Sequence, residues 1–407
     1  MPTAPKLLFL CQTLPYPPDG GVWIRTFHVL RLLAEVFEVT ALCFERGGIA
    51  QHDSLYDPEE SARALGKYAR IEVFRLPQNH SRVRFAWDHL RSLATGRAYT
   101  HYLYDSEAFA DRIEALLREE RFDLVHVDSL DLVRYLPVCQ PLPIVCVHHN
   151  VESQLLARRS QVEGPFWLRR YFALQARLTE RDEKRWVPAV ACNVAVSEAD
   201  AESLRRFGAD ARVEVVPNAV DTEEFQPGAS KREGVVYVGG TNWFPNLDAL
   251  EYFCESMLPR LREHDPGFAA QWIGACSPEQ QQHYREAHGV TLTGYVSDIR
   301  PLARDAFCNI VPLRAGGGTR LKILTSWALG KPVVSTSVGC EGLDARDGEN
   351  ILIRDDPAEF VEAILALKDD PELQDRIGAE ARDTAVSTYS WPSLGPGLHR
   401  LYRDLIA

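Results

Sequence analysis

The sequence predicts an α/β protein built from two doubly wound, Rossmann-like domains. Short apolar runs alternate with helical patterns along the chain, and several runs are apolar on both faces, as strands of a helix-covered parallel sheet are. A length of 407 residues suits two to three domains. A polar stretch containing Pro227 and Gly228 separates two series of apolar runs, so we expect it to link the domains.

Thirteen apolar runs are predicted to be strands. Seven precede the linker, at residues 6–11, 37–44, 71–76, 122–127, 144–148, 191–196 and 213–216. Six follow it, at residues 234–238, 269–273, 290–292, 308–313, 332–336 and 350–353. We therefore expect one domain over residues 1–220 and another over residues 221–390. Residues 391–407 are predicted to form a C-terminal helix that either completes the second domain or packs back on the first.

Charge and composition exclude several classes of protein. The net charge is −12, and residues 201–407 hold 21 basic and 31 acidic residues, a net of −10. Nucleic acid is therefore not an expected partner, because binding it requires a basic face. No apolar run reaches the length of about 20 residues that spans a bilayer. Nine scattered cysteines, mostly within apolar runs, and the lack of a secretory pattern at the start favour a cytoplasmic protein.

A glycine-rich loop in the second half carries the strongest chemical signal. Gly316, Gly317 and Gly318 follow an apolar strand, and a helix predicted from Thr319 to Gly330 comes next. Glycines admit a bulky anion close to the backbone, and the helix N-terminus directs N–H groups and a positive dipole at it. Arg320 and Lys322 add two charges. The pattern predicts a diphosphate site, although a plain glycine-rich turn with a solvated Arg-x-Lys pair explains the spacing equally well. It matches neither a Walker A loop nor G-x-G-x-x-G.

Two further loops follow predicted strands of the first domain. Gly20 and Gly21 follow the first strand and open a helix containing Arg25, which favours an approach to phosphate over a simple turn. His149, Asn150 and Glu152 follow the fifth strand. Ligands of doubly wound sheets bind beyond the carboxyl ends of strands, so these residues are candidates for a site.

Several segments together resemble one known family. Residues 217–221 (Pro-Asn-Ala-Val-Asp) resemble the "PNGVD" segment of family-4 glycosyltransferases, and residues 196–200 resemble their "VSE-x-D". Residues 149–153 resemble the "HNVES" segment of a bacterial branch. The stretch from Gly316 to Leu324, with residues 330–336 and 341–343, is similar to the C-terminal signature of that branch. The matches cover nearly the whole chain in the expected order.

The resemblance implies the GT-B fold, in which two Rossmann-like domains face each other across a cleft. It implies a retaining transferase that moves a sugar from a nucleoside-diphosphate donor to a hydroxyl of a glycan, a lipid-linked or a small-molecule acceptor. The second domain would bind the donor, and the first would bind the acceptor. No cofactor and no metal would be required, in agreement with the lack of a D-x-D pair or a Cys/His cluster with ligand spacing.

The resemblance also implies roles for individual residues. Arg320 and Lys322 would stabilise the departing diphosphate, and His149 would orient the donor sugar, unless it only caps a buried strand end. Arg25, Asn150 and Glu152 would lie on the acceptor side. The expected donor-binding residues are Gly20, Gly21, Asn218, Gly240, Tyr295, Val296, Gly316, Gly317, Gly318, Thr319, Leu321 and Thr325.

One position departs from the family pattern. The family usually carries two glutamates eight positions apart around the glycine-rich loop, and here Gly317 and Thr325 occupy those positions. Glycine is common at the first position in this branch, but threonine cannot offer the two oxygens with which a carboxylate accepts the ribose hydroxyls. Two alternatives therefore stay open: an impaired or non-catalytic nucleotide-binding protein, and a GT-B-like nucleotide-sugar epimerase.

Two stretches combine aromatic and basic residues, one over residues 82–104 and one over residues 166–172. Aromatic side chains are mostly buried, so a core edge with solvated arginines is one interpretation. The other is an acceptor groove or a peripheral contact with anionic lipid at the inner face of a membrane.

Overall fold

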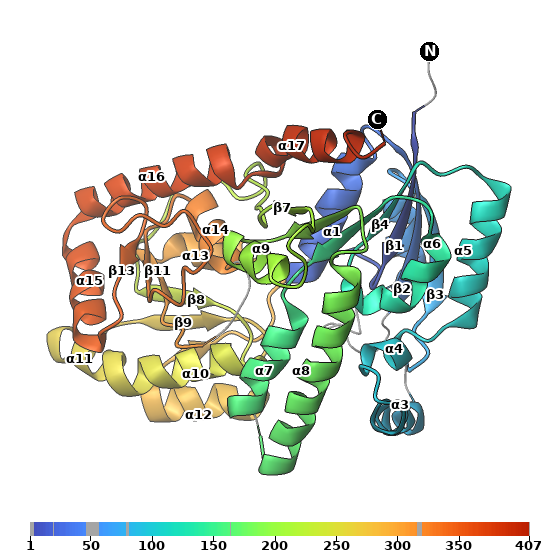
Figure 1. Ribbon diagram of the computed structural model, residues 1–407. Helices are drawn as coiled ribbons and strands as arrows, with labels where there is room; N and C mark the ends of the chain where they lie inside the picture. The colour runs from blue at the N-terminus through green and yellow to red at the C-terminus, as the bar shows by residue number, and fades with distance from the viewer. Residues whose placement is uncertain are drawn as a thin grey trace. The chain divides into compact units, whose positions relative to one another are not determined.

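The computed structural model describes residues 4–18, 20–45, 57–78, 81–162, 164–315 and 320–406. The chain divides into two compact units, which Figure 1 shows with their element labels. Unit 1 comprises Met1–Pro217 and Gly395–Ala407, and unit 2 comprises Asn218–Leu394.

Unit 1 contains a seven-stranded parallel sheet with the order β3-β2-β1-β4-β5-β6-β7. Its strands are β1 (Lys6–Cys11), β2 (Glu38–Glu45), β3 (Arg70–Arg75), β4 (Leu124–Val127), β5 (Ile144–His148), β6 (Cys192–Ala195) and β7 (Val213–Val215). The central strands are apolar on both faces: Leu7, Leu8, Phe9 and Leu10 are all fully buried.

Helices connect these strands and cover the sheet (Figure 1). They are α1 (Gly21–Leu33), α2 (Pro58–Leu65), α3 (Arg82–Thr95), α4 (Thr100–Leu103), α5 (Glu107–Glu119), η1 (Leu130–Tyr135), α6 (Leu136–Cys139), α7 (Glu152–Val162), α8 (Phe166–Trp186) and α9 (Glu198–Arg205). Several begin at a side-chain cap: the Asp57, Ser81, Ser106 and Ser197 side chains accept hydrogen bonds from backbone N–H groups of the first turn.

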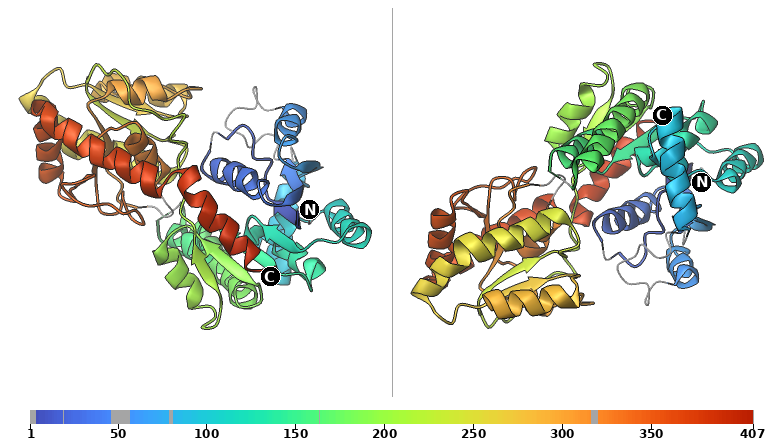
Figure 2. Two further views of the ribbon diagram at one scale, coloured as in Figure 1. Left: turned by 90° about the horizontal axis from the view of Figure 1, so that it is seen from above. Right: turned by 90° about the horizontal axis from the view of Figure 1, so that it is seen from below.

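Unit 2 contains a six-stranded parallel sheet with the order β10-β9-β8-β11-β12-β13. Its strands are β8 (Val235–Val238), β9 (Ala270–Ile273), β10 (Thr291–Leu292), β11 (Cys308–Val311), β12 (Val333–Ser335) and β13 (Leu352–Ile353). Its helices are α10 (Phe244–Tyr252), η2 (Phe253–Met257), α11 (Leu258–His264), α12 (Pro278–His288), α13 (Arg300–Asp305), α14 (Leu321–Ala328), α15 (Pro357–Asp369) and α16 (Pro371–Thr388). Figure 2 shows α16 in front of this sheet from above and α10 with α12 in front of it from below, so helices cover both faces.

The predicted fold class is confirmed. Each of the thirteen predicted strand segments overlaps an observed strand, with ends that differ by at most two residues, and both sheets are parallel. Eight of the nine cysteines are buried, which agrees with their role as small apolar residues.

The C-terminal helix, α17 (Trp391–Arg403), belongs in its greater part to unit 1. His399 Nε2 lies 2.7 Å from the carbonyl oxygen of Leu32, and Tyr402 Oη lies 2.7 Å from Nδ1 of the buried His126. The last turns of the chain therefore pack on the first unit.

The order of each sheet reverses at one place, between β1 and β4 in unit 1 and between β8 and β11 in unit 2. At such a point the connections that follow the two neighbouring strands run to opposite faces of the sheet. The loops beyond the carboxyl ends of these strands therefore diverge, and the space between them can hold a ligand. Residues that follow these four strands are thus the first place to look for a site.

Candidate functional site

Asp128 occupies the reversal point of the unit 1 sheet. It follows β4, is 1% exposed, and accepts a hydrogen bond of 2.9 Å from Oγ1 of Thr26 on α1. His149 Nε2 lies 3.5 Å from Oδ2 and His126 Nε2 lies 3.7 Å from Oδ1 of the carboxylate. Burial by itself raises the pKa of Asp128, but the two neighbouring histidines outweigh it and hold that pKa well below its usual range. The carboxylate is therefore charged at neutral pH.

His149, the predicted sugar-orienting residue, sits directly beside this carboxylate. Its side chain is 8% exposed, and its Nε2 faces Asp128. His148 is turned the other way: its Nε2 lies 2.9 Å from Oδ1 of Asn193 on β6, and burial lowers its pKa to about 4. A carboxylate next to an imidazole fixes the orientation of the ring, so Asp128 positions His149.

Arg25 lies in the interior of unit 1. It is 2% exposed, and its Nη1 donates a hydrogen bond of 3.0 Å to the carbonyl oxygen of Pro217. Burial lowers its pKa to about 10, against the opposing effect of nearby Asp128. Arg25 thus contributes buried positive charge near Asp128.

Asn150 and Glu152 lie at the start of α7, close to a second group of acids. Asn150 Nδ2 lies 3.4 Å from Oε1 of Glu152, and burial together with neighbouring Asp131 raises the pKa of Glu152. Glu183, on α8, is 1% exposed and accepts a hydrogen bond of 3.2 Å from the backbone N–H of Ser153. Burial raises its pKa to about 7. The two carboxyl groups line one cavity with His148 and His149.

Gly20 and Gly21 form the N-terminal end of α1. Gly20 is the N-cap in extended conformation, and Gly21 is exposed. A Cβ on Gly20 would lie 3.3 Å from the ring of Trp23, so the first turn has little space for a side chain there. The described first turn of α1 carries no acidic residue, so no side chain of that turn offsets the positive end of the helix dipole.

Lys322, on α14, is held against the sheet of unit 2. Its Nζ donates hydrogen bonds to Oη of Tyr237 on β8 and, at 2.8 Å, to Oδ1 of Asn246 on α10. The ammonium also lies 4.1 Å from the centre of the Tyr237 ring. Burial, followed by the charge of Arg320, lowers the pKa of Lys322 well below its usual value.

Arg320 immediately precedes α14. It is 7% exposed, and its Nη2 donates a hydrogen bond of 3.1 Å to the carbonyl oxygen of Val338, beyond the end of β12. The charge of Arg320 adds to burial in lowering the pKa of Lys322, so the start of α14 carries a concentration of basic groups. Unit 2 is otherwise strongly acidic, so this concentration favours an anionic ligand.

Glycines let the loops after β8 and β9 approach closely. Gly274 has φ +148°, and a Cβ there would lie 2.5 Å from the backbone nitrogen of Gly240. A Cβ on Gly240 would lie 2.8 Å from the carbonyl oxygen of Ala275. The predicted donor residue Gly240 therefore needs to be glycine for the packing of two strand ends, independently of any ligand.

The remaining predicted donor residues are dispersed within unit 2. Tyr295 is 40% exposed, Val296 packs beside Ile273 and Val236, and Leu321 packs against the core. Asn218 and Thr325 are half-buried. Gly316, Gly317, Gly318 and Thr319 lie outside the described residues, so helix α14 is described only from Leu321, two residues after the predicted start.

Within the described ranges, no group of three or more His, Cys, Asp or Glu side chains could hold a metal ion. In the same ranges, no helix is both long and apolar enough to cross a membrane.

Three polar residues of the candidate site were not predicted from the sequence: Asp128, His126 and Tyr237. Asp128 is a polar residue directly after a predicted strand, and the same kind of position made His149 a candidate. His126 and Tyr237 lie inside apolar strands, where periodicity predicts core residues and gives no indication of a polar partner.

Comparison with known proteins gives two family matches. Residues 19–224 match the family described as Glycosyltransferase Family 4, and residues 232–370 match the family described as Glycosyl transferases group 1. The first match covers just over half of the 407 residues. No curated protein matches the chain in sequence.

Solved structures share the fold at low sequence identity. The Anabaena protein HepE, in complex with UDP, is 15% identical with a TM-score of 0.66, over 98% of this chain and 100% of that chain. The sucrose-phosphate synthase of Thermosynechococcus elongatus is 16% identical with a TM-score of 0.71, over 98% and 99% of the two chains. The chain therefore belongs to glycosyltransferase family 4 and has the GT-B fold.

Proposed function

We propose that the protein transfers a sugar from a nucleoside-diphosphate donor to an acceptor hydroxyl with retention of the anomeric configuration and without a metal ion. The family matches support a glycosyltransferase, and the structural neighbour HepE is described in complex with UDP and with UDP-glucose. UDP-glucose is thus the first donor to test.

The observation that carries the proposal is the pair of buried cations at the start of α14. Arg320 and Lys322 concentrate positive charge in a unit that is otherwise acidic, at the helix that follows β11, a strand of the sheet-reversal point. A diphosphate supplies the negative charge that offsets the cost of burying both groups. Arg320 suits a bidentate contact with phosphate oxygens, and Lys322 suits a point contact.

The chemistry follows from the charges. The bond between the anomeric carbon and the phosphate oxygen breaks, and its electron pair leaves with the diphosphate. The acceptor oxygen forms the new bond on the same face, and its proton passes to the leaving phosphate oxygen. Donors already directed at the diphosphate stabilise the developing negative charge without reorganising. No carboxylate need act as base, and His149, oriented by Asp128, keeps its expected role toward the donor sugar.

The test is nucleotide release from a panel of nucleoside-diphosphate sugars, followed by NMR of the product to read its anomeric configuration. Arg320→Ala is expected to lower kcat about 100-fold, as loss of one oriented donor to developing charge does. Arg346→Ala is the matched control, because Arg346 pairs with Asp344 and Glu349 on the surface of the same unit. Binding without turnover would favour the nucleotide-binding alternative that Thr325 suggests, and isomerised sugar would favour an epimerase.

A further inference from the structure

Helix α3 is attached to unit 1 by its polar face. Its buried residues are Asp88 and Ser92, and no apolar residue of the helix is buried. Asp88 accepts hydrogen bonds from Gln78 at 2.7 Å and from Arg84 at 2.9 Å, while Gln175 of α8 donates to Oγ of Ser92 at 2.8 Å. This arrangement is the reverse of an ordinary surface helix, which turns its apolar face to the core.

The opposite face of α3 is apolar and exposed. Val83, Trp87 and Leu90 follow one another at spacings of four and three residues, so they lie along one side of the helix. They are 82%, 57% and 57% exposed, and Leu93 is 48% exposed. Phe85 is also 53% exposed, but its ring lies on the other side of the helix, against His89 and Tyr99.

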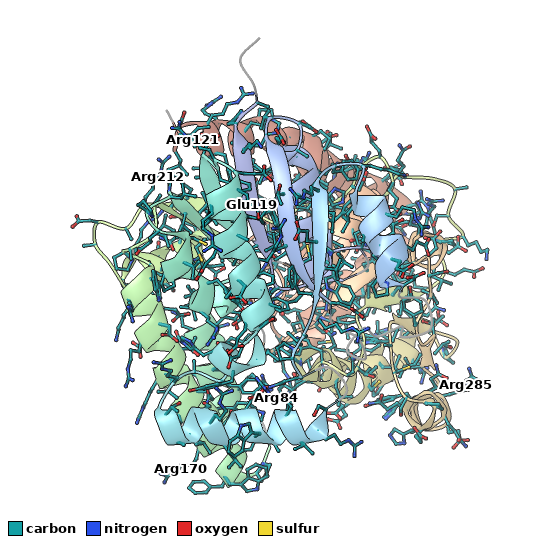
Figure 3. All side chains as sticks on the ribbon, turned by 90° about the vertical axis from the view of Figure 1, so that its right-hand side faces the viewer. Arg84, Glu119, Arg121, Arg170, Arg212 and Arg285 are labelled. Carbon is teal, nitrogen blue, oxygen red and sulfur yellow. The ribbon has the colours of Figure 1, made fainter. Side chains whose placement is uncertain are left out.

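The N-terminal half of α8 carries further exposed apolar side chains. Phe166 and Trp167 are 71% and 70% exposed, and Leu174 is 37% exposed. The two helices are joined by His89 and Tyr171, whose Nδ1 and Oη atoms lie 2.5 Å apart. In Figure 3, Arg84 lies on the side of α3 toward the body of the unit, and Arg170 lies at the outer end of α8.

We call the following residues the α3–α8 surface: Val83, Trp87, Leu90, Leu93, Phe166, Trp167 and Leu174. They are seven of the thirteen exposed large apolar residues in the described part of the chain. So strong a concentration on two adjoining helices marks an interaction surface, because monomeric proteins rarely leave large apolar patches exposed.

The charge around the α3–α8 surface is positive, although the chain as a whole carries −12. Residues 81–97 and 164–177 contain seven arginines. Two of these, Arg84 and Arg91, pair with Asp88 and Asp105, and the other five are Arg82, Arg97, Arg169, Arg170 and Arg177. A cavity of about 480 Å³ adjoins the C-terminal end of α3 and is lined by Arg97, Arg134, Arg181 and Arg185, with His101 bound to Asp182 at 2.8 Å. The surface therefore complements a negatively charged partner.

We propose that the α3–α8 surface docks on a lipid bilayer that carries anionic headgroups. Trp, Phe and Leu on one face with arginines at its borders suit the boundary between headgroups and acyl chains, where the apolar rings are buried and the guanidinium groups reach phosphates. The patch is held rigidly by the polar contacts of α3, so it meets the bilayer without first refolding.

The test is flotation of the full chain with vesicles of phosphatidylcholine alone and of phosphatidylcholine mixed equally with phosphatidylglycerol. We expect binding to the mixed vesicles, weakened by added salt.

Two double variants test the two parts of the surface. Trp87→Ser with Leu90→Ser is expected to weaken binding to the mixed vesicles at least about tenfold. Arg82→Gln with Arg170→Gln is expected to weaken it about 30-fold, because each lost cation lowers the affinity roughly fivefold. The matched controls are Val386→Ser and Arg285→Gln, exposed residues of unit 2 that should leave binding unchanged.

Three results would overturn the proposal: no binding to mixed vesicles, equal binding to neutral vesicles, or no effect of Trp87→Ser with Leu90→Ser. Light scattering identifies the alternative occupant. If that double variant turns a dimer into a monomer while vesicles bind neither form, a second copy of the chain covers the surface instead.

Discussion

The Nζ atom of Lys322 lies 2.8 Å from Oδ1 of Asn246, so a lysine on α14 is tied to the helix that follows β8. The same ammonium donates to Oη of Tyr237 and lies over its ring. None of these partners carries a negative charge, and burial keeps the pKa of Lys322 low. The site thus places an amine among neutral partners, where burial disfavours its charged form in the ligand-free protein and a bound anion would favour it.

Replacing Lys322 with methionine should separate binding from stability. Methionine fills a similar volume without the cost of burying an amine, so we expect the free energy of unfolding to stay near or above the wild-type value. Nucleoside-diphosphate affinity should fall at least about tenfold, since a hydrogen bond to a charged group contributes roughly 1.5–3 kcal/mol. Calorimetric titration with UDP and thermal unfolding measure the two quantities.

Lys331 provides the control for that variant. It is another buried lysine of unit 2, and its Nζ donates to Oγ of Ser230 at 2.7 Å and to the carbonyl oxygen of Ala306 at 2.9 Å. Removing Lys331 takes a donor from that carbonyl, whereas Tyr237 Oη still donates to Asn246 Oδ1 when Lys322 is replaced. Lys331→Met should therefore lower stability and leave nucleotide affinity unchanged. If both variants bind UDP like the wild type, the diphosphate does not reach Lys322.

The stability of unit 1 should depend on pH through Glu183. Its pKa is about 7 in the folded protein and about 4.3 in the unfolded chain. Because the folded pKa is raised, the contribution of protonated Glu183 to the free energy of unfolding is fully present below about pH 4. That contribution is lost as the pH rises to about 7. Glu183→Gln should remove this loss, so that between pH 5 and pH 8 the variant loses roughly 2–4 kcal/mol less stability than the wild type.

Urea unfolding at both pH values tests this expectation. Glu180→Gln is the matched control on the same helix, because Glu180 is partly exposed and pairs with Lys184 at 2.6 Å. Equal pH dependence in wild type and Glu183→Gln would show that Glu183 titrates normally in the folded state.

The strands were predictable from sequence, whereas the partners of the site residues were not. Runs such as residues 6–11 and 144–148 are apolar on both faces, and burial in a parallel sheet leaves few alternatives for them. Strand order depends on which runs pair across long connections, and no local pattern encodes it. For that reason the pairing of β1 with β4 was seen only in the structure. This pairing places Thr26, on the helix after β1, next to Asp128, which follows β4.

Lys322 illustrates the same limit within the candidate site. Its charge and its place after the glycine-rich loop made it a candidate, but nothing in the sequence indicated that its ammonium would contact Tyr237. Tyr237 lies in an apolar strand, and only the geometry of β8 against α14 makes its hydroxyl a partner.

A chelator should leave activity intact. The proposed mechanism assigns to Arg320 and Lys322 the electrostatic work that a divalent cation does in other transferases. We therefore expect the same rate of nucleotide release before and after dialysis against EDTA. Loss of activity that Mg²⁺ or Mn²⁺ restores would mean that a metal bridges the diphosphate, and that the two cations are insufficient.

Thr325 tests the alignment of α14 with the family pattern. It lies half-buried one turn after Leu321, at the position where the family usually has a ribose-binding glutamate. If ribose is recognised there, Thr325→Glu should tighten UDP binding, because a carboxylate accepts hydrogen bonds from both ribose hydroxyls at roughly 1.5–3 kcal/mol before desolvation. A partly buried carboxylate without a partner costs stability, so the variant should unfold more easily alone and regain stability when UDP is added. Thr325→Gln, of similar size but uncharged, separates the charge from the added bulk. Unchanged or weaker UDP affinity in a folded Thr325→Glu protein would mean that other residues hold the ribose.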